Sequence, residues 1–140
     1  MKKIFSLLMV LPIFLFAQIE KESIENDLYL LPNVAFKEIP TANGYEASYE
    51  LRITQLLDHK DSSKGFFEQR VFLNHKGYER PTVIVTQGYS NDRNGIYGPT
   101  KLLKANQINV EHRFFGESMP DSMNYSFLNL EQATADLHDI

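Results

Sequence analysis

The stretch PTVIVTQGYSNDRNGIYGPTKLLKANQINVEHRFFG, residues 81–116, decides the fold of this chain. Residues 81–86 are a short run rich in β-branched side chains, which is typical of a strand buried on both faces of a parallel sheet. Pro99 begins a helical pattern over residues 100–106, and residues 107–110 are a second short strand pattern. A strand, a helix and a second strand in this order predict a parallel pair joined by a right-handed crossover.

The patterns on either side extend this unit. Residues 48–55 and 66–73 read as two strands joined by the polar loop 58–65, and a turn at 74–81 follows. Downstream, Asn129 is placed to cap a helix that starts at Leu130, and Gln132 at the third helical position predicts a capping box. A hairpin followed by strand, helix, strand and helix predicts an α/β fold with a mostly parallel sheet.

The N-terminal residues have the layout of an export signal. Lys2 and Lys3 precede an apolar run over residues 4–16, and Ala17 offers a small residue for cleavage. We therefore expect residues 1–17 to be a signal peptide of an exported protein, periplasmic or secreted; an uncleaved membrane anchor and a buried N-terminal helix are the alternatives. No stable membrane anchor is expected after cleavage. Residues 18–47 are expected to form a leader segment with a short helix over 19–28.

Composition excludes several classes of function. The formal net charge is −4, which provides no basic surface for nucleic acid. The chain has no cysteine, so a disulfide framework, a thiolate metal site and a cysteine nucleophile are all ruled out. His112 has no second histidine at ligand spacing, so neither a metal nor another cofactor is expected.

Two short segments follow the two predicted parallel strands and are the candidate site residues. The first is Gln87, Gly88 and Tyr89, and the second is Glu111, His112 and Arg113. Carboxyl ends of parallel strands are where sites form in such sheets. The glycine either serves a tight turn or lets backbone N–H groups approach a substrate oxyanion. The second segment either contains a Glu111–Arg113 pair that orients the loop or acts directly in catalysis.

The serines and histidines form no catalytic set within this sequence. Ser118 lies in Gly-Glu-Ser-Met-Pro rather than in the Gly-x-Ser-x-Gly elbow of a serine hydrolase, so we expect it to be an ordinary loop residue. His59, His75 and His138 are scattered, and the first two are expected at the surface of the hairpin ends or as capping groups. No catalytic residue is therefore assigned in this chain.

The final helical pattern is still in phase at Ile140, with no closing cap or strand. Two buried strands alone do not make a sheet that is covered on both sides. We therefore expect the domain, residues 48–140, to be the N-terminal portion of a larger catalytic domain. A small complete α+β domain is the alternative.

Several motifs stand out along the chain: Gln55-Leu-Leu-Asp-His59, Gly65-Phe-Phe-Glu-Gln-Arg70, Thr86-Gln-Gly-Tyr89, Val110-Glu-His-Arg-Phe-Phe-Gly116 and the stretch 125–138. Their order resembles that found at the start of the S37 serine peptidases. The chain resembles this family, the secreted tripeptidyl aminopeptidases related to the S28 prolyl carboxypeptidase and dipeptidyl peptidase group, over about residues 48–140. The Val-Glu-His-Arg-Phe-Phe-Gly segment is the most specific part.

The resemblance implies the front of an α/β-hydrolase fold and a Ser-His-Asp acyl transfer that releases short peptides from the N-terminus of a peptide substrate. It implies that Gly88 or Tyr89 contributes an N–H to the oxyanion hole, and that this part of the chain alone is inactive. Gln87 stands where an acidic residue is expected, which would weaken a contact with the substrate's α-amine. An exported esterase or lipase of the same fold and a non-catalytic binding module of the cell envelope remain alternatives.

Overall fold

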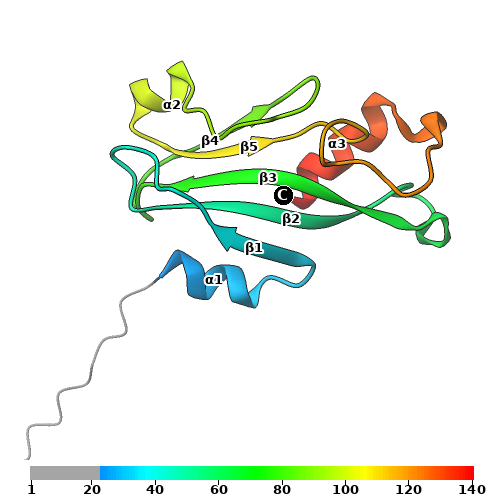
Figure 1. Cartoon of the computed structure of the whole chain (residues 1–140), viewed down its shortest axis with the longest axis horizontal. Helices are drawn as coiled ribbons and strands as arrows, with labels where there is room; N and C mark the ends of the chain where they lie inside the picture. Colours follow the sequence, from blue (N-terminus) through cyan, green and yellow to red (C-terminus); the bar gives the residue numbers. More distant parts are fainter. Residues whose placement is uncertain (1–22) are drawn as a thin grey trace, which may run out of the picture.

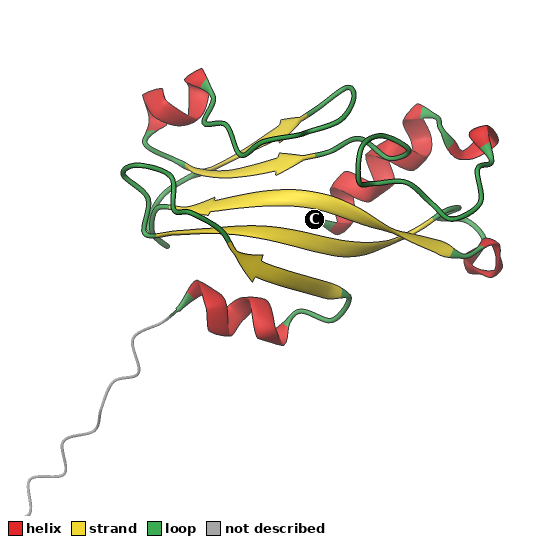
Figure 2. Cartoon of the chain, viewed as in Figure 1, coloured by secondary structure: helices red, strands yellow, loops and turns green. Residues whose placement is uncertain are grey.

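The computed structural model describes residues 23–140, whose strands form a single open sheet with short helices packed beside it (Figures 1 and 2). In chain order the elements are α1 (Ile24–Leu30), β1 (Val34–Glu38), β2 (Ala47–Leu56), the 3-10 helix η1 (Ser62–Lys64), β3 (Phe66–His75), β4 (Thr82–Thr86), α2 (Gly98–Leu103), β5 (Asn106–Val110), the 3-10 helix η2 (Tyr125–Phe127) and α3 (Leu130–Asp139). The class is α/β, as predicted.

The strands lie in the order β1-β2-β3-β5-β4. β4 and β5 are parallel, with Ile84 opposite Ile108, which confirms the predicted strand–helix–strand pair. The predicted hairpin is also present, because β2 and β3 pair antiparallel over their whole length. The expectation of a mostly parallel sheet is wrong for the described residues, because β3 pairs antiparallel with β5 and thereby joins the hairpin and the parallel pair into one mixed sheet.

The two faces of the sheet differ in chemistry. On one face an apolar cluster is formed by alternate residues of the central strands, among them Leu51, Val71 and Val110, and Leu28 of α1 packs into it. Leu137 and Ile140, at the end of α3, pack against the same cluster. On the opposite face β5 carries polar side chains that bind the long loop between β4 and α2. The period of two along β5 thus separates a core face from a loop-binding face.

β4 is less buried than its sequence predicts. Its residues alternate between exposed and half-buried, and Ile84 remains 49% exposed, so the expectation of a strand buried on both faces is wrong within the described residues. The reason is topological, because β4 is the last strand on its side of the described sheet and only β5 pairs with it. β5 is buried as expected, but most of its buried side chains are polar.

The bounds of α1 and α2 differ from those predicted from the sequence. α2 ends at Leu103 rather than Asn106 because Lys104 adopts a left-handed conformation (φ 50°). α1 begins at Ile24, and the part of the predicted leader helix before residue 23 lies outside the described residues, as does the predicted signal peptide. β1 lies in a segment for which no strand was predicted, and its pairing with β2 places it. None of the described helices has the length and apolar character needed to cross a membrane.

Candidate functional site

The candidate residues meet at the carboxyl ends of β4 and β5. A small cavity of about 40 Å³ lies there, beside α3. Four of the six predicted site residues line this cavity: Gln87, Glu111, His112 and Arg113. Gln69 and Asp136 are among the other residues that line it. The structure therefore brings the two predicted segments together at one edge of the sheet, as parallel strand ends require.

The loop that follows β4 presents its backbone to the outside at Gly88. A Cβ atom added at Gly88 would meet no atom within 4 Å, so crowding does not demand a glycine there. Tyr89 is 71% exposed, and its carbonyl accepts a hydrogen bond from the His112 N–H (3.3 Å). The Gln87 N–H donates to the Val110 carbonyl (3.0 Å), which continues the β4–β5 pairing by one residue. Open space beside Gly88 is compatible with a bound substrate group.

The side chain of Gln87 is part of the loop's own support. Its Nε2 group donates to Asn109 Oδ1 (3.0 Å) and to the Tyr97 hydroxyl. The amide therefore bridges β5 and the far end of the loop. Both bonds use Gln87 as a donor, which a carboxylate at this position would not be.

A row of polar side chains on β5 holds this loop along its length. Gln107 and Asn109 are alternate residues of β5, and Glu111 continues the alternation one residue past the end of the strand. All three side chains bond to the loop after β4. Gln107 Nε2 donates to the Gly95 carbonyl (2.7 Å), and its Oε1 accepts from the Tyr97 N–H (3.0 Å). Asn109 Nδ2 donates to Asn91 Oδ1 (3.3 Å). The loop has no helix or strand of its own, so polar side chains of β5 serve as hydrogen-bond partners for its polar groups.

Glu111 has the densest set of contacts in this row. Its carboxylate is fully buried. Oε1 accepts from Arg70 Nη2 (2.6 Å) and the Asn91 N–H (2.7 Å), and Oε2 accepts from Ser118 Oγ (2.8 Å) and the Glu117 N–H (2.9 Å). The charge of Glu111 is thereby compensated by Arg70 and by donors from two loops.

The expected pair between Glu111 and Arg113 is wrong. Glu111 pairs with Arg70 of β3, and Arg113 pairs with Asp136 of α3. Residues two apart point to the same side only in an extended strand, but β5 ends at Val110 and the chain enters a turn at Arg113. Each of the two charges therefore organises a different loop.

The turn after β5 has an unusual backbone. Phe114 and Gly116 both have positive φ angles, 68° and 54°. A Cβ atom on Gly116 would overlap the Glu111 carboxylate. Ser118 is fully buried, donates to Glu111 and accepts from the Arg70 N–H (2.9 Å). Its position in a loop agrees with the prediction, and its hydroxyl is occupied by structural contacts.

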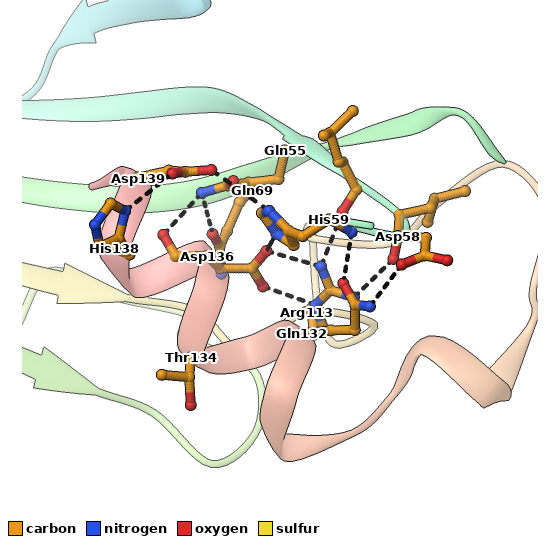
Figure 3. A network of polar contacts seen from close by, with 12 residues as sticks. Gln55, Asp58, His59, Gln69, Arg113, Gln132, Thr134, Asp136, His138 and Asp139 are labelled. Carbon is orange, nitrogen blue, oxygen red and sulfur yellow. Dashed lines mark hydrogen bonds and ion pairs between the residues drawn. The ribbon is translucent and has the colours of Figure 1, made fainter. Parts of the chain in front are cut away.

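A second buried network joins the end of β5, the hairpin tip and α3 (Figure 3). Arg113 is fully buried and makes two parallel bonds to Asp136, Nε to Oδ2 and Nη2 to Oδ1, both 2.7 Å. His59 Nε2 lies 2.8 Å from Asp136 Oδ1, a distance at which an N–H donates to the carboxylate. The remaining Arg113 donors go to the carbonyls of Leu56, Leu57 and Phe127. Arg113 thus does not face solvent, and its side chain joins α3 to the hairpin tip by hydrogen bonds.

The predicted capping box of α3 is only half formed. Asn129 Oδ1 accepts from the Gln132 N–H (3.0 Å), which confirms the cap. The Gln132 side chain does not return to the cap residue. Its Oε1 accepts from the His59 N–H (2.8 Å) and its Nε2 donates to Asp58 Oδ1 (2.9 Å), so it fastens the helix to the hairpin tip (Figure 3).

His112 lies close to two aromatic rings, an exposed one of Tyr89 and a half-buried one of Phe115. Its ring meets Phe115 edge-on at 5.6 Å, and Phe115 meets Tyr89 in the same way at 5.1 Å. Nδ1 of His112 lies 2.8 Å from the Arg113 carbonyl, and since a carbonyl only accepts, Nδ1 carries the hydrogen. The His112 N–H bonds to the Tyr89 carbonyl, so these rings belong to the two segments that follow β4 and β5.

His59 and His75 were expected at the surface or as capping groups, and neither lies at the surface. His75 is buried, and the side chain of His59 is only 15% exposed because it packs against Asp136. His138 is exposed. Within residues 23–140 no group of three or more histidine, aspartate or glutamate side chains is arranged to hold a metal ion.

Sequence reasoning missed the partners of the predicted residues. Arg70 and Asp136 neutralise Glu111 and Arg113, but they lie about 41 and 23 residues away in sequence. The row Gln107, Asn109 and Glu111 did carry a usable signal, since alternate polar residues in a buried strand and directly after it need polar partners. That partner is the loop after β4.

Comparison with known proteins gives the family. The family model of the PS-10 peptidase S37 matches residues 17–140. A prolyl tri/tetrapeptidyl aminopeptidase of Streptomyces mobaraensis is 36% identical over 116 residues, which are 82% of this chain and 24% of the relative. The serine protease vicPb of Bipolaris victoriae (strain FI3) is 32% identical over 98 residues, 59% of this chain and 18% of that protein. The chain thus spans about a quarter or less of the length of these curated relatives.

Proposed function

The chain belongs to the PS-10 peptidase S37 family of peptidases, and from this membership we propose that it is the front of an exported serine aminopeptidase. The family match over residues 17–140 carries the proposal. A relative named as a prolyl tri/tetrapeptidyl aminopeptidase supports release of short peptides from a substrate N-terminus. At family level the protein is a hydrolase that acts on peptides.

We propose that the described sheet is the first part of an α/β-hydrolase fold. Two features support this. The parallel pair β4–β5 places a glycine-containing loop at a carboxyl strand end, where such folds bind ligands. The loop after β4 also exposes its backbone, as a donor of an oxyanion hole must.

The proposed chemistry is acyl transfer by a serine, a histidine and an acid that lie outside this sequence. In that reaction the serine attacks the scissile carbonyl and the histidine takes its proton. The N–H of Gly88 or Tyr89 would donate to the oxyanion that develops on the carbonyl oxygen. The role of residues 87–91 is then to offer a fixed donor, while Glu111 and its partners hold that donor in place.

Export is a further part of the proposal. It rests on the basic and apolar layout of residues 1–17. N-terminal sequencing of the protein recovered from outside the cytoplasm should begin at or near Gln18. A mature protein that still begins at Met1 would contradict cleavage.

The activity is tested on the full-length protein with matched peptides. We expect release of a chromophore from a tri- or tetrapeptide amide with a free N-terminus, and loss of that release when the N-terminus is acetylated. A fluorophosphonate should block the reaction by labelling the serine. Cleavage of acetylated and free peptides alike would contradict an aminopeptidase, and cleavage of esters without amides would identify an esterase instead.

A further inference from the structure

The loop after β4 is held in place by a fully buried carboxylate. Glu111 lies at the end of β5, and its two oxygens accept four hydrogen bonds from Arg70, Asn91, Glu117 and Ser118. Two of these donors are backbone N–H groups, one in each of the two loops that leave the carboxyl ends of β4 and β5. Glu111 therefore connects both loops to the sheet through one side chain.

The position of Asn91 makes this connection relevant to chemistry. Asn91 follows Gly88 by three residues, and its N–H lies 2.7 Å from Glu111 Oε1. The other end of the short segment is fixed by the Gln87 N–H, which bonds to β5. Gly88 and Tyr89 thus lie between two fixed points at the end of β5, and the Tyr89 carbonyl is itself bonded to the His112 N–H. Movement of the Asn91 anchor would change the direction of the N–H groups between them.

The loop after β5 is shaped to the same carboxylate. Gly116 adopts φ +54°, and a side chain on it would overlap the Glu111 carboxylate. The turn therefore closes tightly over Glu111 and keeps water away from it. A buried acceptor in such a place makes strong charge-assisted hydrogen bonds.

We propose that Glu111 is a positioning residue that fixes residues 88–91 so that the N–H of Gly88 or Tyr89 points at the oxyanion of the reaction. This inference rests on the proposed serine-hydrolase function. Glu111 itself has no open face toward a substrate, because both of its oxygens are occupied by protein donors. Its effect on the reaction passes through the loop.

The test compares Glu111→Gln and Ser118→Ala with wild type in the full-length protein. In Glu111→Gln an amide –NH2 group replaces one acceptor oxygen and faces the donors, so we expect kcat to fall by about 10- to 100-fold, as when an oxyanion donor is misplaced, with KM changed less than about 3-fold. Ser118→Ala removes only one donor to the carboxylate, and we expect a smaller fall in kcat, below about 10-fold.

A second measurement reports the loop without any need for activity. Hydrogen exchange of the Asn91 and Glu117 amides should become faster in both variants, since both amides donate to Glu111 in the wild type. The control is Ile53→Val, which removes one methyl group from the apolar cluster on the opposite face. It should lower stability while it leaves kcat and these two amides unchanged.

The outcomes separate the inference from the function on which it rests. Faster loop exchange with an unchanged kcat would overturn the positioning role, and so would unchanged exchange. If Glu111→Gln does not fold, Ser118→Ala decides by the same criteria. An inactive wild-type protein would contradict the proposed function and catalytic positioning with it, while the exchange data would still show whether Glu111 orders the loop.

Discussion

At the scale of single residues, the most demanding position is Gly116. Its positive φ disfavours any L side chain, and the space where a Cβ would lie is occupied by the Glu111 carboxylate. We expect Gly116→Ala to lower the free energy of unfolding by about 2–3 kcal/mol, from backbone strain and overpacking together. Chemical denaturation measures this change.

Gly98→Ala is the matched control for this substitution. Gly98 starts α2, no atom lies within 4 Å of an added Cβ there, and no positive φ is involved. Its effect should stay within about 0.5 kcal/mol. Equal losses for both variants would show that the Gly116 turn is not shaped by Glu111.

Arg113 is the residue whose removal should cost the most stability. Its guanidinium and the Asp136 carboxylate are both buried, so Arg113→Met leaves an uncompensated charge beside His59. We expect a loss of about 3–5 kcal/mol in the free energy of unfolding. In a double-mutant cycle with Asp136→Leu, the double variant should recover part of that loss.

The exposed pair Lys60–Glu131 provides the comparison. Both of its side chains are more than half exposed, and solvent screens the 2.7 Å contact. Lys60→Ala should leave the midpoint of denaturation nearly unchanged. If Lys60→Ala lowered the free energy of unfolding as much as Arg113→Met does, burial of the Arg113–Asp136 pair would not explain the cost of losing Arg113.

At the scale of secondary structure, the start of α3 depends on its cap. Asn129 Oδ1 accepts from the Gln132 N–H, and Asn129→Ala should cost about 1 kcal/mol of stability because that N–H loses its partner. Thr134→Ala is the control, since Thr134 lies exposed within the same helix and bonds only to the Leu130 carbonyl in the preceding turn. Thermal unfolding of both variants beside the wild type measures the difference.

The elements also show what the sequence can and cannot predict. The hairpin and the strand–helix–strand unit follow from local periodicity, and the Asn129 cap follows from a local hydrogen bond. β1 was missed because its five residues are strand only through their pairing with β2, a contact across a long turn. The partners of Glu111 and Arg113 were missed for the same reason, because ion pairs between distant segments leave no local pattern.

At the scale of the whole molecule, β4 is the element whose surroundings do not match its composition. A run of β-branched residues is typical of a strand paired on both sides, yet β4 pairs only with β5 within the described residues. In the full-length protein we expect a further strand along the outer edge of β4, as an α/β-hydrolase fold would require.

Hydrogen exchange tests this expectation directly. In the full-length protein, the amides of residues 82–86 that point away from β5 should be protected to the same degree as those of the central strands. The outward-facing amides of β1, at the other edge of the described sheet, serve as the internal reference for an edge strand. Exchange of the β4 amides as fast as that reference would argue against an added strand.

The bonds between α3 and the hairpin tip have a consequence for folding during synthesis. Gln132 bonds to the His59 N–H across 73 residues of sequence, and Gln55 bonds to the Asp136 carbonyl across 81. The hairpin therefore leaves the ribosome long before its partners exist, and these polar groups remain hydrated until α3 is made. Contacts of such large sequence separation form late, because the chain between them must first be closed into a loop. The bonds of Gln132 and Asp136 to the hairpin are then a closing step of folding, which satisfies the polar groups of His59 and Gln55 only after α3 has been synthesised.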